Sequence, residues 1–484
     1  MKKNYRFINS LLICSLLISM IVSGCSQNQP NQGQPSQSAQ PEQTSNAPDS
    51  SPTATPASNE KTTPVPEWAY NATMYEVNIR QYTKEGTFKA FEEHLPRLKK
   101  MGIRILWFMP IHPISEEKRL ETLGSYYSVA DYKDVNPEFG TLDDFKALVD
   151  KCHEMGFKVM LDWVANHTGW DNAWIDEHED WYTKDANGNI IIPPTTSWSD
   201  VADLNYDNQD MRAEMIEAMS FWVREYDVDG FRCDYATGVP LDFWETAREA
   251  LEKIKPVFML AEDDRSMAFM KYAFNTNYGW GLYHNMNKIA KGLYSPNGLI
   301  SYFESIQSRY PGDTYPLHFI DNHDENSWNG TVEERLGQAQ YPMLALIFTA
   351  PGMPLIYSGQ EANLNRRLLF FQKDEIDWTS LSNEELISTL VKLKLDHPAL
   401  WNGDRGGSVE FMQTSDKKVL SYERVKDEDR VFVVLNLSSK AIDATITLNQ
   451  GFSGTNVLTK EDIALSEGDN TIKLEPWEFR IFAK

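Results

Sequence analysis

Short apolar runs alternate with longer amphipathic segments from Trp68 to about Leu400. The runs are bounded by Gly, Pro or Asn, which is typical of buried strands. Strands that alternate with helices form a parallel sheet, so eight units predict an α/β fold, a (β/α)8 TIM barrel over residues 67–400. The expected strands, of which the sixth lies in a region without a sharp pattern, are Met74–Val77, Ile103–Phe108, Lys158–Trp163, Val228–Asp234, Val257–Glu262, Phe274–Trp280, Leu317–Asn322 and Pro354–Tyr357.

Two helices between these strands have clear signals. Phe88–Met101 has apolar residues at helical spacing and is followed by Gly102, a helix-stop signal. A second helix is expected to begin at Thr141, with Asp144 three residues on as in a capping box, and to end at Gly156.

A long segment, from His167 to about Asn205, separates the third strand from the next helix and predicts a short inserted domain. Asp185–Asn189 within it favours a hairpin turn at Asn187-Gly188. A calcium loop is the alternative, although no Glu follows at the spacing of an EF-hand.

The pattern changes after about Leu400, where short alternating strands are separated by polar turns. Residues 401–484 are therefore expected to form an antiparallel β-sandwich. Its predicted strands are Val419–Val425, Arg430–Leu437, Ala444–Leu448 and Thr471–Leu474.

The N-terminus has the pattern of a targeting segment. Basic residues precede the apolar run Leu11–Val22, which is too short to predict a transmembrane helix. Val22-Ser23-Gly24-Cys25 resembles a bacterial lipobox, which predicts that residues 1–25 are a lipoprotein signal and that Cys25 carries the lipid. The alternative is an ordinary signal peptide with an incidental Cys. The lipobox interpretation predicts an extracytoplasmic protein, at the cell surface or facing the periplasm, anchored to the membrane.

Residues 26–66 are mostly Gln, Ser, Asn, Thr and Pro, without any aromatic residue, Leu, Ile or Met. Such a segment cannot bury a core and is expected to be a disordered tether. In the folded part, Cys152 and Cys233 are expected to be buried free thiols. The formal net charge of −24 disfavours nucleic acid as a partner and is compatible with a neutral substrate. The sequence predicts no oligomeric state.

The fourth strand contains a charged pair. Side chains alternate along a strand, so Arg232 and Asp234 share one face, while Phe231 and Cys233 face the helical layer. Two opposite charges on a buried face need each other. One interpretation is a structural ion pair. The other is that Arg232 keeps Asp234 ionised, with a lowered pKa, as a nucleophile.

The other strands also end in polar residues. Because a barrel has its active site at the carboxyl ends of its strands, these residues are expected to lie together. The strand ends are Asp162–His167, Arg232–Asp234, Ala261-Glu262 and Asp321–Asp324.

These four segments resemble the sequence signatures of the α-amylase family of glycoside hydrolases. A barrel, an insertion after the third strand and a C-terminal β domain also fit that family. Further matching stretches are Tyr127–Tyr132, Asn136–Thr141, Asp203–Asn205 and Gly352–Glu361.

The resemblance implies roles for three carboxylates. Asp234 would be the nucleophile that forms a covalent glycosyl intermediate. Glu262 would protonate the leaving oxygen and then deprotonate water, with its pKa raised by partial desolvation. Asp324 would hold sugar hydroxyls and favour ring distortion. This is the two-carboxylate chemistry of retaining enzymes, and it requires no catalytic metal.

Other residues would bind the substrate by the same resemblance. Arg232 would keep Asp234 charged, and His167 and His323 would donate hydrogen bonds to sugar hydroxyls. Asp162 would hold a hydroxyl of the same sugar, and Tyr127 would stack under its ring.

The chain departs from the family pattern at two positions. Many α-amylases have Lys-His three and four residues after the nucleophile, where this chain has Thr237 and Gly238. We therefore expect an open, weakly binding acceptor side. Asn166 matches a family calcium ligand, so a structural calcium and a calcium-free insertion both stay open.

The resemblance leaves three functions to compare. The first is hydrolysis of α-1,4-glucans such as starch fragments and maltodextrins. The second is transglycosylation, which uses the same residues but passes the glycosyl group to a sugar. The third is an inactive glycan-binding relative, which the presence of all three carboxylates disfavours.

Overall fold

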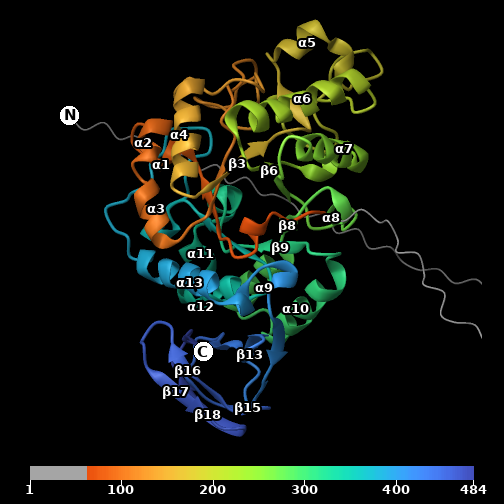
Figure 1. The fold of residues 1–484 in the computed structure, drawn as a ribbon. Helices are drawn as coiled ribbons and strands as arrows, with labels where there is room; N and C mark the ends of the chain where they lie inside the picture. The colour runs from red at the N-terminus through yellow and green to blue at the C-terminus, as the bar shows by residue number, and fades with distance from the viewer. Residues whose placement is uncertain (1–62) are drawn as a thin grey trace, which may run out of the picture. The chain divides into compact units, whose positions relative to one another are not determined.

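A computed structural model describes residues 63–484, and its centre is a closed barrel of eight parallel strands (Figure 1). The signal segment, Cys25 and the tether up to residue 62 lie outside the described residues. Neighbouring strands around the barrel are β1-β10-β9-β8-β7-β6-β3-β2, which confirms the predicted fold. Their bounds are β1 Met74–Val77, β2 Ile105–Phe108, β3 Lys158–Trp163, β6 Gly230–Cys233, β7 Phe258–Ala261, β8 Thr276–Tyr278, β9 Tyr315–His318 and β10 Met353–Tyr357.

The seventh barrel strand differs from its prediction. It was expected at Leu317–Asn322, but β9 covers Tyr315–His318 and the chain leaves the barrel before Ile320. The reason is that the carbonyl of Ile320 and the carboxylate of Asp321 are bound by the Arg335 side chain instead of by a neighbouring strand. The apolar pattern of the sequence does not indicate where a side chain such as Arg335 binds the backbone in place of a neighbouring strand.

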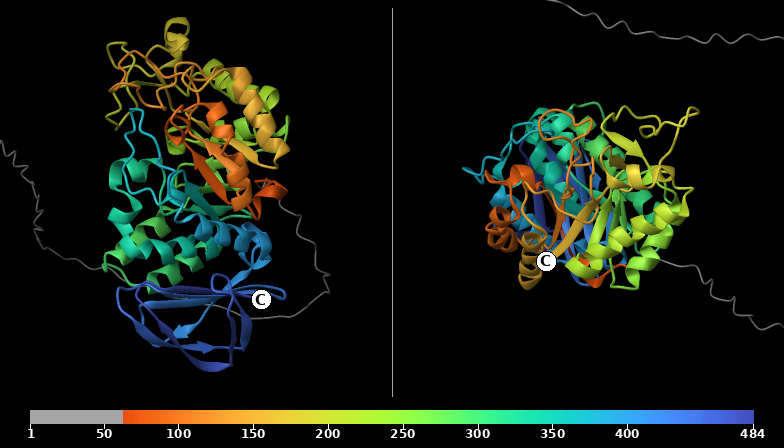
Figure 2. Two further views of the ribbon diagram at one scale, coloured as in Figure 1. Left: turned by 90° about the vertical axis from the view of Figure 1, so that its left-hand side faces the viewer. Right: turned by 90° about the horizontal axis from the view of Figure 1, so that it is seen from above.

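Helices surround the barrel and bury their apolar faces against it (Figures 1 and 2). The thiols of Cys152 and Cys233 are free and buried in this layer, as predicted. The helices outside the insertion are α1 Ile79–Tyr82, α2 Phe88–Glu92, α3 Leu95–Met101, α4 Leu142–Glu154, α6 Gln209–Tyr226, α7 Leu241–Glu252, α8 Phe269–Tyr272, α9 Trp280–Ala290, α10 Asn297–Arg309, α11 Val332–Leu336, α12 Gln340–Thr349 and α13 Glu384–Asp396.

Three of these helices test the two predicted helices directly. The single helix expected at Phe88–Met101 is wrong, because the chain breaks between α2 and α3. Pro96 lacks the N–H that would continue the hydrogen bonds from α2, and it lies in the first turn of α3, where this is tolerated. In contrast, α4 has the predicted capping box, with reciprocal hydrogen bonds of 3.1 and 3.2 Å between Thr141 and Asp144.

The inserted domain is small and begins at the end of the third barrel strand. Its strands β4 (His167–Gly169) and β5 (Val201–Asp203) pair antiparallel, and the helix α5 (Ala173–Glu177) lies between them in sequence. Asp185–Asn189 forms the predicted turn, with Gly188 at φ +88°. The Asp185 carboxylate accepts the backbone N–H groups of Asn187 and Asn189, at 2.8 and 2.9 Å, so it is engaged by its own turn.

The C-terminal region forms two antiparallel sheets around their own apolar core, as predicted (Figure 2). This domain packs on the barrel's helical layer, where Arg424 donates a 2.8 Å hydrogen bond to the Thr349 carbonyl at the end of α12. The larger sheet contains β11 Ser408–Phe411, β13 Val419–Lys426, β14 Asp429–Asn436, β19 Phe479–Ala483, β16 Phe452–Asn456 and β17 Asp462–Leu465, and the smaller sheet contains β12 Gln413–Thr414, β15 Ile442–Leu448 and β18 Gly468–Leu474.

The predicted tether extends too far. Residues 63–66 were assigned to it, but they pack against the barrel, where the Pro64 carbonyl accepts hydrogen bonds of 2.8 and 2.7 Å from Arg248 and Asn275. Asn275 directly precedes β8, so this segment lies at the end of the barrel where the strands begin. Across residues 63–484, no helix is both long and apolar enough to cross a membrane.

Candidate active site

A pocket of about 910 Å³ lies at the carboxyl ends of the barrel strands. The three predicted catalytic carboxylates, Asp234, Glu262 and Asp324, all line it. So do three of the predicted substrate-binding residues, Tyr127, His167 and His323. The strand-end prediction therefore brought together residues that are up to about 200 positions apart in sequence.

One guanidinium organises the carboxylates. Arg232 is fully buried, and its Nη1 lies 2.8 Å from Asp162 Oδ1 and 2.9 Å from Asp234 Oδ1. Its Nη2 lies 3.0 Å from Glu262 Oε1. The expected ion pair between Arg232 and Asp234 is present, but it belongs to a cluster of three carboxylates around one cation. Such sharing holds Asp234 and Glu262 close together on one side of the pocket.

The pKa values of the two carboxyls differ in part from expectation. Burial raises the pKa of Asp234 to about 6, against the lowering effect of Arg232, so the predicted lowered pKa is wrong. Desolvation outweighs the ion pair because Arg232 divides its charge among three carboxylates. Burial raises the pKa of Glu262 further, to about 7, as predicted. Burial raises both pKa values, and that of Glu262 more, so Asp234 is the first of the pair to ionise.

A second chain of polar contacts supports this cluster from the other side. His323 pairs through Nδ1 with the buried carboxylate of Glu76 and donates from Nε2 to the Tyr127 hydroxyl at 2.8 Å. That hydroxyl donates to Asp162 at 3.1 Å. Burial opposes protonation of His323, but the carboxylates of Asp324 and Glu76 outweigh it and raise its pKa to about 9. The imidazole is therefore a charged double donor at neutral pH.

Glu76 is a site residue that the sequence reasoning missed. It lies in β1 between the buried residues Tyr75 and Val77, within a run that was interpreted only as an apolar strand. The available signal was its position: a charged residue near the carboxyl end of a barrel strand, on the face that points inward.

Two of the predicted substrate-binding residues lie behind the pocket wall. Asp162 and Arg232 are fully buried and do not line the pocket. Asp162 accepts hydrogen bonds from Trp107 and Tyr127 in addition to its pairing with Arg232. Asp162 thus positions the side chains of Arg232, Trp107 and Tyr127. Its contact with a sugar hydroxyl stays a prediction.

His167 lies at the rim formed by the insertion. Burial lowers its pKa to about 4, so the ring is neutral. The Asn166 amide donates to His167 Nδ1 at 3.2 Å, because an NH₂ group can only donate. The proton is therefore on Nε2.

The predicted calcium ligand Asn166 lies next to Gly238. A Cβ added to Gly238 would come within 2.2 Å of Asn166 Oδ1, so the backbone of residue 238 closes one side of this oxygen. Nowhere in the described part of the chain do three His, Cys, Asp or Glu side chains gather in a metal-binding arrangement. A structural calcium at Asn166 stays a prediction, and we assign no step to a metal.

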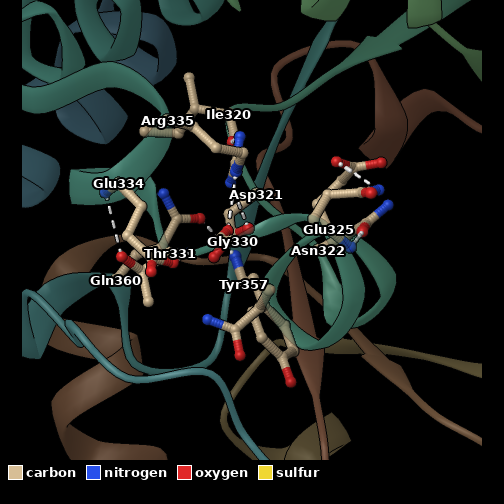
Figure 3. A network of polar contacts seen from close by, with 12 residues as sticks. Ile320, Asp321, Asn322, Glu325, Gly330, Thr331, Glu334, Arg335, Tyr357 and Gln360 are labelled. Carbon is tan, nitrogen blue, oxygen red and sulfur yellow. Dashed lines mark hydrogen bonds and ion pairs between the residues drawn. The ribbon is translucent and has the colours of Figure 1, made fainter. Parts of the chain in front are cut away.

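Arg335 binds Ile320 and Asp321 at the start of the loop that follows β9 (Figure 3). The Arg335 guanidinium donates to the carbonyls of Gly330 and Ile320, at 2.8 and 2.9 Å, and pairs with Asp321 at 2.6 Å. Within the loop, Asn322 caps the turn by accepting the Glu325 N–H at 2.8 Å. These contacts fix the position of the loop whose residues His323 and Asp324 line the pocket.

Replacing Arg335 is expected to destabilise the fold. Arg335→Ala should lower the free energy of unfolding by about 3 kcal/mol, near the lower end for a broken buried ion pair, because Asp321, whose pKa burial raises to about 7, can take up a proton. Denaturant unfolding at pH 7 measures this. As a control, Arg224→Ala removes an exposed Arg paired with Glu217 and should leave the denaturant midpoint nearly unchanged. Equal costs for the two variants would contradict the assignment.

Aromatic side chains line both ends of the pocket, and the sequence reasoning did not single them out. Phe370 stacks beside Tyr127 with ring centres 6.2 Å apart, and Trp328 lies 5.3 Å from Phe370. Trp198 lies 5.5 Å from His167 and 5.4 Å from Tyr235. These rings come from segments far apart in sequence, so only the tertiary fold assembles them.

Comparison with known proteins shows the family to which the chain belongs. The family model described as alpha amylase, catalytic domain, matches residues 49–200 and 194–407, and the model for the maltogenic amylase C-terminal domain matches residues 409–481. The chain therefore belongs to the alpha-amylase family of glycoside hydrolases.

The solved structure of a noncanonic maltogenic alpha-amylase, AmyB, from Thermotoga neapolitana is similar, with a TM-score of 0.78 and 31% identity over 85% of this chain and 98% of that chain. Alpha-amylase MalA of Haloarcula japonica is 24% identical over 85% of this chain, which spans 62% of that relative. Maltogenic alpha-amylase of Bacillus acidopullulyticus is 24% identical over 82% of this chain and 70% of its own length. Other relatives are named cyclomaltodextrinase and alpha-1,4-glucan:maltose-1-phosphate maltosyltransferase.

Proposed function

We propose that this protein hydrolyses α-1,4-glucosidic bonds in starch-derived glucans and maltodextrins and retains the configuration of the anomeric carbon. The observation that carries the proposal is the pair Asp234 and Glu262, which share Arg232 and face one open pocket. Retaining chemistry requires two carboxyls about 5 Å apart, which a shared guanidinium favours. The names of the relatives support an α-glucan as the substrate.

The reaction proceeds in two displacements. Asp234 attacks the anomeric carbon, a C–O bond to its carboxylate forms, and the glycosidic bond breaks as Glu262 gives its proton to the leaving oxygen. Glu262, now ionised, takes a proton from water, which attacks the anomeric carbon and releases Asp234. Asp324, whose side chain is 38% exposed to the pocket, accepts hydrogen bonds from the sugar hydroxyls.

Transglycosylation is the second candidate. It uses the same intermediate, and a relative named as a maltosyltransferase supports keeping it. Product profiles on starch, maltodextrin, cyclodextrin and pullulan, with and without added maltose, separate the two. Hydrolysis predicts reducing sugar without an acceptor, whereas dependence on added maltose would favour the transferase. No product on any of these substrates would favour an inactive glycan-binding relative.

Activity is expected to be bell-shaped in pH, with a maximum between about 6 and 7. Below this window Asp234, whose pKa is about 6, is protonated and cannot attack. Above it Glu262, whose pKa is about 7, has lost the proton that the leaving group needs. Measuring kcat/KM as a function of pH gives the apparent pKa of the acid limb and of the alkaline limb. Both apparent pKa values belong to the interacting pair rather than to either residue alone. A flat profile from pH 5 to 9 would contradict these protonation states.

We also propose that the protein is a lipoprotein held at an extracytoplasmic membrane surface through Cys25. Support comes from the lipobox-like residues 22–25 and from the Thr63–Pro66 segment, which leaves the barrel at the end away from the pocket. Cys25→Ser is expected to move the protein from the membrane fraction to the soluble fraction, measured by detergent partitioning. Cys14→Ser, in the same signal, is the matched control and should not do so. Unchanged partitioning of Cys25→Ser would overturn the proposal.

A further inference from the structure

Two aromatic side chains, Tyr235 and Trp198, form a wall of the pocket beside the proposed nucleophile. Tyr235 follows Asp234 in sequence and has the unusual φ of +40° for a residue with a side chain. Its ring meets Trp198 of the insertion edge to face, with ring centres 5.4 Å apart at 82°. Both residues line the pocket, and Trp198 is 39% exposed. The wall therefore joins the barrel to the insertion at the pocket's rim.

Gly238 makes room for this wall. A Cβ at position 238 would come within 2.6 Å of Tyr235 Cδ1 and 2.7 Å of Cε1, so a larger residue would displace the ring. The space that the sequence led us to expect as an open acceptor side is thus occupied by the Tyr235 ring. The unusual residues at positions 235 and 238 are coupled by packing.

The position of Glu262 indicates which sugar of the substrate would contact the wall formed by Tyr235 and Trp198. The backbone N–H of Tyr235 donates a 2.8 Å hydrogen bond to Glu262 Oε2. Glu262 protonates the leaving oxygen, so the sugar that departs lies on its side of the cleaved bond. In contrast, Trp328 and Phe370 adjoin His323 on the other side of the pocket.

We propose that Tyr235 and Trp198 form an aromatic acceptor subsite for the glucosyl unit beyond the cleaved bond, and that this subsite decides which leaving groups and acceptors the enzyme uses. The proposal rests on the retaining α-glucanase function above. Flat aromatic rings at a partly exposed rim suit the apolar C–H faces of a neutral sugar, because burying these faces removes apolar surface from water.

The subsite gives the second displacement two outcomes. A sugar held there attacks the anomeric carbon through a hydroxyl oxygen. A new glycosidic C–O bond forms, the bond to Asp234 breaks, and the hydroxyl proton passes to the Glu262 carboxylate. Water takes the same path when the subsite is empty. Binding of an acceptor sugar at the wall therefore shifts the product from the hydrolysed donor sugar to the acceptor sugar lengthened by the donor.

The experiment compares two substrates that share the same donor sugar. Maltotetraose has a sugar leaving group, which would occupy the wall, and α-maltosyl fluoride does not. The measured quantity is the ratio of kcat/KM for maltotetraose to kcat/KM for the fluoride. Tyr235→Ala and Trp198→Ala are each expected to lower this ratio about 5- to 10-fold, which corresponds to the loss of one aromatic contact of about 1 to 1.4 kcal/mol. Tyr235→Phe keeps the ring and should keep the ratio.

Matched controls separate this subsite from general damage. Trp328→Ala removes a ring that is 52% exposed on the other side of the pocket and should change both rates together, leaving the ratio within about 2-fold. Tyr294→Ala removes a tyrosine that is 43% exposed outside the pocket and should leave the ratio unchanged. Trp198→Ala changes a partly exposed ring on the insertion, so it tests the subsite even if Tyr235→Ala fails to fold.

Two outcomes have different meanings. A ratio that stays within 2-fold of wild type in Trp198→Ala, and in Tyr235→Ala where that variant folds, would overturn the acceptor subsite. A wild-type protein that cleaves neither maltotetraose nor the fluoride would instead overturn the proposed function itself.

Discussion

Asp234→Asn is expected to lower turnover of every α-glucan substrate by at least about 10⁴-fold, which is the usual size of the rate loss when a catalytic nucleophile is removed. The amide cannot attack the anomeric carbon, so no glycosyl ester forms. The fold should survive, since Arg232 keeps its ion pairs with Asp162 and Glu262. Initial rates on maltodextrin and on α-maltosyl fluoride measure the loss, because even an activated leaving group needs the nucleophile.

Asp242→Asn is the matched control for this variant. Asp242 is an exposed aspartate that pairs with Arg212 on the surface, away from the pocket, and its replacement should leave the rate unchanged. Asp234→Asn protein that unfolds at the wild-type denaturant midpoint yet keeps more than a few per cent of wild-type activity would show that another group is the nucleophile.

Glu262→Gln is expected to have an effect that depends on the leaving group. Cleavage of maltotetraose should fall about 10³-fold, within the range for loss of general acid–base catalysis. Formation of the intermediate from α-maltosyl fluoride should suffer far less, because fluoride leaves without a proton. The glutamine can still accept the Tyr235 N–H that Glu262 Oε2 accepts, so the pocket wall is preserved.

Azide provides the second readout for this variant. Without the Glu262 base, water attacks the intermediate slowly, whereas azide needs no base. Added azide should therefore raise the rate with the fluoride donor and give an α-linked glycosyl azide, formed from the β-linked ester at Asp234. Equal losses on both substrates, with no azide product, would show that Glu262 is not the acid and base.

The strand ends that form the site could be predicted because parallel strands in a barrel deliver their carboxyl ends to one face. That rule placed Asp234, Glu262 and Asp324 together from local patterns alone. It failed at β9, where Arg335 binds backbone and carboxylate groups that were expected to continue the strand. It also overlooked Glu76, which lies inside a run that was interpreted only as a strand.

Properties that depend on three-dimensional packing were beyond the sequence. The pKa of Asp234 was expected to fall because Arg232 is two residues away, but its burial and the sharing of Arg232 are set by neighbouring strands. The wall of Tyr235 and Trp198 likewise depends on how the insertion folds against the barrel. Gly238 could be seen as a departure from the family pattern, but not as the space that the Tyr235 ring fills.

The central claim is that Asp234 and Glu262 divide a retaining double displacement between them. The most direct test is the anomeric configuration of the first product, followed by proton NMR during the opening minutes of maltodextrin cleavage by the wild-type enzyme, before mutarotation. Two inversions at the same carbon predict that the α anomer appears first and equilibrates to the mixture afterwards. A β anomer appearing first would mean a single displacement by water and would contradict the roles given to both carboxylates.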